Sequence, residues 1–78
     1  MVKNPSDMTR EEFLMKSRKY YNRYGSKLWI SSKYYCNVSQ ETHNQVVANP
    51  NLTFVDGYYL QHLKNDNKTE EVKKLLSR

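Results

Sequence analysis

The sequence has few of the residues that cross-link or interrupt a fold: one cysteine, two glycines and two prolines among 78 residues. The lone Cys36 cannot form an intramolecular disulfide and leaves no second thiol for a cysteine-rich zinc site. The scarcity of glycine and proline excludes a flexible linker and a collagen-like chain. The length accommodates one small hydrophobic core. We expect a flexible arm over residues 1–8 and a single small domain over 9–78.

Long apolar segments are also missing. No run approaches the roughly 18 residues that a membrane span requires, and the N-terminus lacks the apolar stretch of a secretory signal. We therefore expect a cytoplasmic protein with no membrane partner.

Groups that could carry catalysis or bind a metal are sparse. His43 and His62 lie 19 residues apart, with only Cys36 as a further soft ligand, and zinc sites usually combine three or four such ligands. No glycine-rich phosphate loop is present, and nothing indicates a base that would activate Cys36 as a nucleophile. We expect no enzymatic activity, no metal and no cofactor.

Positive charge, by contrast, is plentiful and unevenly distributed. The net charge is +5, and residues 1–35 hold eight Lys and Arg against three Asp and Glu, whereas residues 36–78 hold five of each. Between Lys16 and Lys27 there are five cations and no acid. A cationic surface of this kind suits phosphate backbones or acidic protein partners.

Helical periodicity and capping signals predict a first helix over residues 9–24. Thr9 and Glu12 have the spacing of a capping box, and Gly25 is expected to end the helix in a left-handed conformation. Apolar and tyrosine side chains recur between them at helical intervals. The short apolar run at 28–30 favours a strand.

Two short helices are predicted in the middle of the chain. Residues 31–36 are expected to be helical, although their alternating pattern also fits an extended strand. Ser39 is expected to cap the next helix. This helix must end before Pro50, because the residue that precedes proline disfavours helical geometry.

The C-terminal third contains one ambiguous segment. Asp56-Gly57 lies between two β-prone runs, which predicts a hairpin over residues 52–63 with a type I′ turn. The competing interpretation is a helix capped by Asp56, whose apolar face consists of Tyr59, Leu60 and Leu63. Asn67 is predicted to cap a last amphipathic helix, which either packs on the domain or forms a dimer contact.

The segment from Asn37 to Val47 reads Asn-Val-Ser-Gln-Glu-Thr-His-Asn-Gln-Val-Val. It resembles the turn and recognition helix of helix-turn-helix DNA-binding proteins, and is most similar to the Gly-Val-Ser-x-x-Thr-Val-x-x-Val pattern of Lac-repressor-type regulators. Many winged-helix proteins approximate the same pattern. The chain departs from it at Lys33, where a small residue is usual, and at His43, where Val or Ile is usual.

The resemblance implies a mainly α-helical winged helix-turn-helix fold with a small β-hairpin. Residues 31–36 would be the positioning helix, 40–48 the recognition helix and 52–63 the wing. An all-α domain of three or four helices is the alternative. The residues expected to contact double-stranded DNA are Ser39, Gln40, Glu41, Asn44, Gln45, Lys33 and the first-helix cations Lys16, Lys19 and Arg23.

The sequence therefore predicts a small non-enzymatic, sequence-specific double-stranded DNA-binding protein, a transcription regulator or a replication or recombination accessory factor of phage-like character. The alternative is a small inhibitor or adaptor that engages an acidic surface of a host or regulatory protein. A third hypothesis is single-stranded nucleic-acid binding through Tyr20, Tyr21 and Tyr24. The sequence leaves open whether the protein is a monomer or a homodimer.

Overall fold

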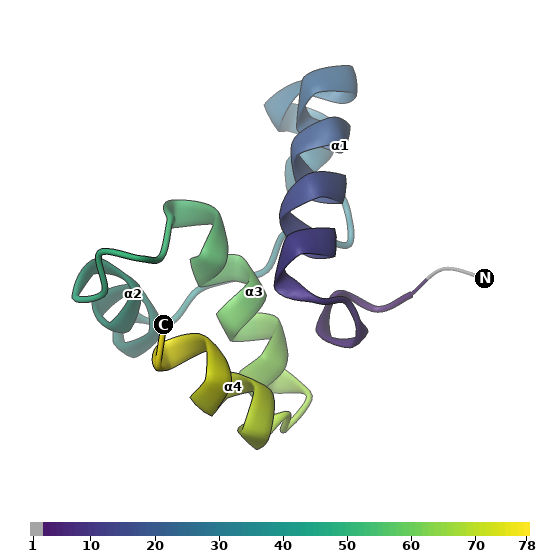
Figure 1. Cartoon of the computed structure of the whole chain (residues 1–78). Coiled ribbons are helices and arrows are strands. Elements are labelled where there is room, and N and C mark those ends of the chain that lie inside the picture. The colour runs from purple at the N-terminus through teal and green to yellow at the C-terminus, as the bar shows by residue number, and fades with distance from the viewer. Residues whose placement is uncertain (1–2) are drawn as a thin grey trace.

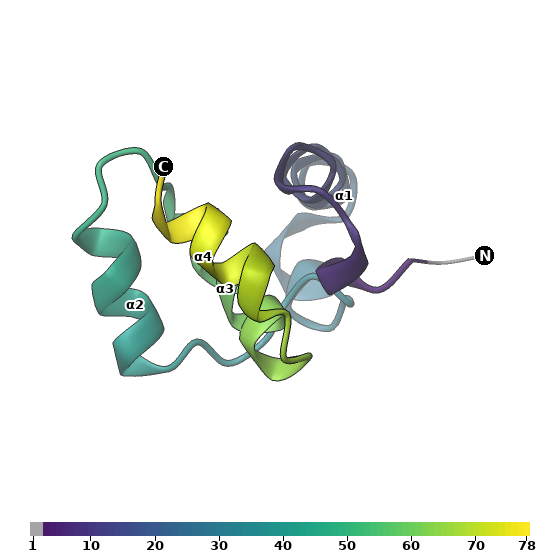
Figure 2. The ribbon, with the colours of Figure 1, turned by 60° about the horizontal axis from the view of Figure 1, so that its bottom comes forward.

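α3 (Phe54–Asn65) lies at the centre of the structure, and the other elements pack around it (Figure 1). The computed structural model describes residues 3–78. In chain order, the elements are the 3-10 turn η1 (Pro5–Asp7), α1 (Arg10–Ile30), α2 (Gln40–Val47), α3 and α4 (Thr69–Leu76). α1 and α2 lie on opposite sides of α3 in both views (Figures 1 and 2). None of the helices described is long and apolar enough to cross a bilayer.

None of residues 3–78 forms a β-strand. The expected winged helix-turn-helix fold is therefore wrong, and the all-α alternative fits the four helices. Residues 28–30, predicted as a strand, are the last turn of α1. Residues 31–36, predicted as the positioning helix, are turns and irregular chain. The expected wing, 52–63, is instead mostly α3.

The Asp56-Gly57 pair, which predicted a hairpin turn, lies inside the first turns of α3. Asp56 Oδ2 accepts hydrogen bonds from the backbone N–H of Thr53 at 2.6 Å and from its hydroxyl at 3.0 Å. A carboxylate at this position stabilises a helix start, because it satisfies an orphan donor and faces the positive end of the helix. Thr53, not Asp56, is therefore the N-cap residue. A type I′ turn would need positive φ at both central residues, but within residues 3–78 positive φ occurs only at Gly25 and Asn67.

Gly25 divides α1 into two helical segments. Thr9 caps the first segment as predicted, since its hydroxyl accepts the backbone N–H of Glu12 at 3.1 Å. At Gly25 the chain leaves helical geometry, with φ 82° and ψ 176°, but it resumes a helix for one more turn over 26–30. The chain after this second segment returns along the first, because the ring of Tyr34 lies 5.8 Å from that of Phe13.

Aromatic side chains connect the returning chain to the centre of the fold. Phe13 is completely buried, and its ring centroid lies 5.2 Å from that of Tyr59 and 6.0 Å from that of His62. The His62 ring nitrogen Nε2 lies 3.1 Å from the Tyr34 carbonyl oxygen. Leu60 and Leu63 on α3 are also completely buried, and Tyr59 is only 4% exposed. Tyr59, Leu60 and Leu63, the apolar face that the helical alternative predicted, thus form the face of α3 that packs in the core.

Residues 1–8 are predicted to be a flexible arm, and residues 1–2 of this segment lie outside the described residues. Within the described part, Pro5, Ser6 and Met8 are buried and η1 packs on α3. The Tyr59 hydroxyl donates to the Met8 carbonyl at 2.6 Å, and the Ser6 hydroxyl donates to Asp66. These contacts join the start of the chain to the middle and to the C-terminal end of α3.

Asn67 ends α3 instead of capping the next helix. Its φ is 58°, the Lys68 N–H donates to the Leu63 carbonyl at 2.8 Å, and the Asn67 N–H donates to the Lys64 carbonyl at 3.1 Å. This pair of bonds is a Schellman motif, in which asparagine takes the left-handed position that glycine usually holds. α4 then packs on α3 through Leu75, which is 3% exposed.

A buried ion pair joins the starts of α1 and α3. Asp56 is completely buried, and Arg10 Nε and Nη2 donate to its two carboxylate oxygens at 2.7 and 3.1 Å. Hydrogen bonding to Asp56 raises the pKa of Arg10 above its ordinary value, so the guanidinium stays charged. With the two bonds from Thr53, both oxygens of the carboxylate are satisfied.

We expect Asp56→Ala to lower the free energy of unfolding by about 3–5 kcal/mol, because it leaves Arg10 without a partner and the helix without its capping carboxylate. Urea denaturation followed by circular dichroism measures this loss. Asp7→Ala is the matched control: Asp7 forms an exposed pair with Lys68 at 3.2 Å, which contributes at most about 1 kcal/mol. Equal losses in the two variants would contradict a central role for the buried pair.

Substitution of the two glycines should have opposite effects. Gly25→Ala should cost about 1–3 kcal/mol, because its φ and ψ fall in a region that residues with a Cβ rarely adopt. Gly57→Ala should be neutral or stabilising by up to about 1 kcal/mol, since alanine favours helix and the nearest atom to its Cβ would be 3.8 Å away. Thermal or urea unfolding of both variants is the measurement. A Gly57→Ala variant less stable than Gly25→Ala would contradict these assignments.

Candidate functional site

The most unusual surface of the molecule surrounds the N-terminus of α3, where large apolar side chains face solvent. Phe54, the first residue of α3, is 71% exposed, and Val47 at the end of α2 is 69% exposed. Ile30 and Met15, both on α1, are 55% and 50% exposed. Single exposed apolar residues are common in proteins, but a contiguous group of them usually marks an interaction surface.

Two open grooves meet at this surface and share three aromatic walls, Tyr35, Phe54 and Tyr58. These three rings are held together: Tyr58 packs against Phe54 at 5.6 Å and against Tyr35 at 5.6 Å between centroids. Trp29 supports Tyr58 from behind at 4.9 Å. The aromatic ridge between the grooves is therefore braced by residues of α1, α3 and the returning chain.

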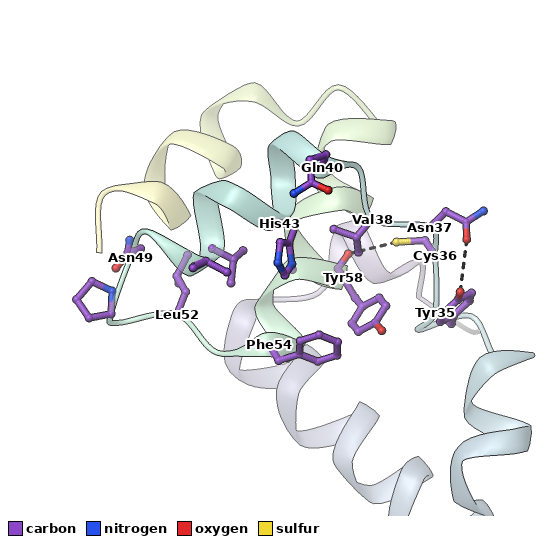
Figure 3. Close-up of a pocket in the computed structure, with 14 residues that line it drawn as sticks. Tyr35, Cys36, Asn37, Val38, Gln40, His43, Asn49, Leu52, Phe54 and Tyr58 are labelled. Atoms are coloured by element: carbon purple, nitrogen blue, oxygen red, sulfur yellow. Dashed lines mark hydrogen bonds between the residues drawn. The ribbon is translucent and has the colours of Figure 1, made fainter.

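The first groove, which we call the α2 groove, lies between α2, the segment 35–38 and the start of α3 (Figure 3). It encloses about 690 Å³. Gln40 and His43 border it from α2, and Asn49 lies at its far end (Figure 3). Its lining combines amide and imidazole groups with apolar side chains.

Cys36 belongs to the α2 groove but is not a reactive group. Its Sγ lies 3.5 Å from the Tyr58 carbonyl, to which the thiol donates (Figure 3). Burial raises the pKa of this thiol to about 11, so it stays protonated at neutral pH and is a poor nucleophile. Within residues 3–78 no cluster of three His, Cys, Asp or Glu side chains could hold a metal ion.

The second groove, which we call the α1 groove, lies between the two segments of α1 and the start of α3. It encloses about 950 Å³. Most of its lining is apolar or aromatic, including Leu14, Met15, Trp29, Ile30, Phe54 and Val55. Arg18 and Lys19 are its only charged lining residues among those described, and both are exposed. The groove thus presents an apolar floor beside a positive edge.

The α2 residues predicted to contact DNA lie together, but several are engaged within the protein. Ser39 is the N-cap of α2 as predicted, since its hydroxyl accepts the Thr42 N–H at 3.2 Å. Its own backbone N–H donates to Gln61 Oε1 at 3.1 Å. Gln45 Oε1 accepts from Lys64 Nζ at 2.6 Å, so this amide faces α3.

The other α2 side chains predicted to contact DNA, those of Gln40, Glu41 and Asn44, point away from the core. Gln40 Nε2 donates to Asn44 Oδ1 at 2.9 Å, and both side chains are exposed, as is Glu41. They form an outward-facing row on the side of α2 that does not contact α3.

The predicted cations lie on a different part of the surface. Lys16 pairs with Glu12 at 3.4 Å, and the Arg23 guanidinium lies 5.4 Å from the centre of the Tyr24 ring. Lys33 Nζ donates to the Lys3 carbonyl at 3.2 Å. Because α1 and α2 lie on opposite sides of α3, the predicted DNA-contact residues form two separate groups.

Sequence reasoning missed the apolar part of the site. It assigned Phe54 to a wing and Ile30 to a strand, so neither was considered as a surface anchor. The available signal was the spacing of Thr53 and Asp56, which fits a capping pair and makes Phe54 the first residue of a helix.

The chain matches no protein-family model, no curated protein and no solved structure. Its function is therefore inferred from its own surface.

Proposed function

We propose that the protein is a small non-enzymatic protein-binding module, an adaptor or inhibitor that acts in the cytoplasm on a partner with an acidic surface. The exposure of Phe54 on the ridge between two grooves is the observation that carries this proposal. Aromatic residues that project from a rigid support are favoured interface anchors, because they bury a large area and lose little side-chain entropy on binding.

The support beneath Phe54 is rigid for identifiable reasons. Phe54 follows the Thr53 cap and precedes the Arg10–Asp56 pair by two residues, and its ring packs against Tyr58 at 5.6 Å. Anchors held in place before binding improve affinity, because less conformational freedom is lost on association.

The charge distribution supports an acidic partner. Residues 16–33 hold six Lys and Arg and no Asp or Glu. Positive charge near a binding surface attracts an acidic partner during encounter and disfavours basic ones.

We expect Phe54→Ser to reduce binding of a partner about tenfold or more, the effect of losing an interface hot spot. The full chain, immobilised, is exposed to an extract of the cells that produce it, and retained proteins are quantified by mass spectrometry. Leu28→Ser is the matched control, because Leu28 is 49% exposed and lines neither groove. Circular dichroism checks that both variants are folded. Partner recovery that is equal for wild type and Phe54→Ser would refute the proposal.

Double-stranded DNA is a second candidate partner, favoured by the same six cations and by the exposed Gln40 and Asn44 amides. These amides have the donor and acceptor groups that pair with adenine in the major groove, and the cations would contact phosphates. In this hypothesis the protein binds DNA as an all-α domain.

A fluorescence-anisotropy titration with duplex DNA at several salt concentrations tests this second candidate. Arg23→Gln with Lys27→Gln should weaken binding and reduce the dependence of log K on log salt by about 1 per charge removed. Neither residue lines a groove, so the variant leaves the protein-binding surface intact. Lys73→Gln with Lys74→Gln on α4 is the control. Absence of binding at low salt would exclude this function, and an equal effect of the control would exclude Arg23 and Lys27 as the specific phosphate contacts.

A further inference from the structure

We infer that the α1 groove is a docking site for an amphipathic α-helix of a partner protein that carries Asp or Glu along one flank of its apolar face. This inference rests on the proposed protein-binding function and specifies the occupant of one groove. It concerns the groove between the two segments of α1 and the start of α3, with its apolar floor and its positive edge.

The walls of the groove favour a helix as the occupant. On α1 the wall residues Met15, Arg18, Lys19 and Asn22 recur at helical spacing over about two turns, or roughly 10 Å. An occupant helix of similar length would present apolar side chains at positions i, i+3 or i+4, and i+7, the usual anchors of a helix in a groove. An extended peptide that adds to a sheet edge is not an option here, because no strand occurs in residues 3–78.

The exposed apolar side chains fix where these anchors would sit. Met15 and Ile30 come from the two segments of α1, and Phe54 comes from α3. Each is at least half exposed, so a helix laid between them would remove apolar surface from water on three sides. Such burial supplies most of the favourable free energy of helix-in-groove complexes.

The positive edge indicates an acidic flank on the occupant. Arg18 and Lys19 line the groove, and neither has a carboxylate within 4.0 Å among residues 3–78. Lys16, one turn earlier, differs because Glu12 already pairs with it at 3.4 Å. A carboxylate from a partner would therefore complement charges that the chain itself leaves uncompensated.

The α2 groove is a weaker candidate for the same occupant. Its volume is smaller, about 690 Å³ against about 950 Å³. Its lining includes the polar side chains of Asn37, Gln40, His43 and Asn49, and no Lys, Arg, Asp or Glu. It therefore lacks the charge that would select an acidic helix.

A displayed library of peptides of about 15 residues tests the inference, with full-length chain as bait and the Phe54→Ser variant for counter-selection. This length is the shortest at which isolated helices are appreciably populated. The library contains helix-favouring, proline-rich and fully random members. We expect enrichment of sequences with apolar residues at i, i+3 or i+4, and i+7 and with Asp or Glu flanking them. Enrichment of proline-rich or basic peptides would overturn the inference.

A synthetic copy of the most enriched peptide then maps the site. Titrated into the isotope-labelled full chain, it should shift the amide resonances of Met15, Arg18, Ile30 and Phe54. Arg18→Glu with Lys19→Glu should weaken its binding about tenfold or more, and raised salt should weaken the wild-type complex. Lys73→Glu with Lys74→Glu reverses the same number of charges on α4 and should leave binding unchanged. Shifts confined to the α2 groove, or equal effects of the two double variants, would refute the assignment.

The two proposals fail in different ways. If Phe54-dependent capture of a protein persists but no acidic helical peptide is enriched, the protein-binding function stands and the helical occupant is wrong. If Phe54-dependent capture is also absent, the function itself is wrong.

Discussion

The hydrogen-bonded ion pair between Arg10 and Asp56 is the constraint on which the rest of the structure depends. It spans 46 residues of sequence and joins the first residue of α1 to the first turn of α3. The same carboxylate also accepts hydrogen bonds from the Thr53 backbone N–H and hydroxyl. Asp56 therefore both caps the start of α3 and attaches α1 to α3. An unpaired carboxylate would not remain charged in this completely buried position without a large cost in free energy.

The candidate functional surface follows from this constraint. Once α3 begins at Phe54, that side chain projects into solvent between two grooves. The break at Gly25 supplies the second wall of the larger groove, because the segment of α1 that follows it places Trp29 and Ile30 in the lining beside side chains of the first segment. Two local features, one carboxylate and one glycine, thus position apolar groups that are distant in sequence.

The chemistry of this surface fits the proposed binding role. Its only thiol is held protonated by burial, which raises its pKa to about 11, and its other groups are apolar, aromatic, amide, hydroxyl, imidazole or cationic. Charges of this kind, set beside an apolar groove, increase encounter rates and select partners, whereas the apolar area provides affinity. The same cations suit a phosphate backbone, which is why protein and nucleic acid emerge as the two candidate partners.

The sequence by itself determined the features that depend on neighbouring residues: the Thr9 and Ser39 caps, the break at Gly25 and the uneven charge. A cap or a glycine break acts over three or four residues, so it can be read locally. Only the tertiary structure decided between hairpin and helix at Asp56-Gly57, because the deciding partner, Arg10, lies far away in the sequence. It also decided which apolar residues face solvent, since a periodic pattern shows which side chains share a face but not whether another part of the chain covers that face.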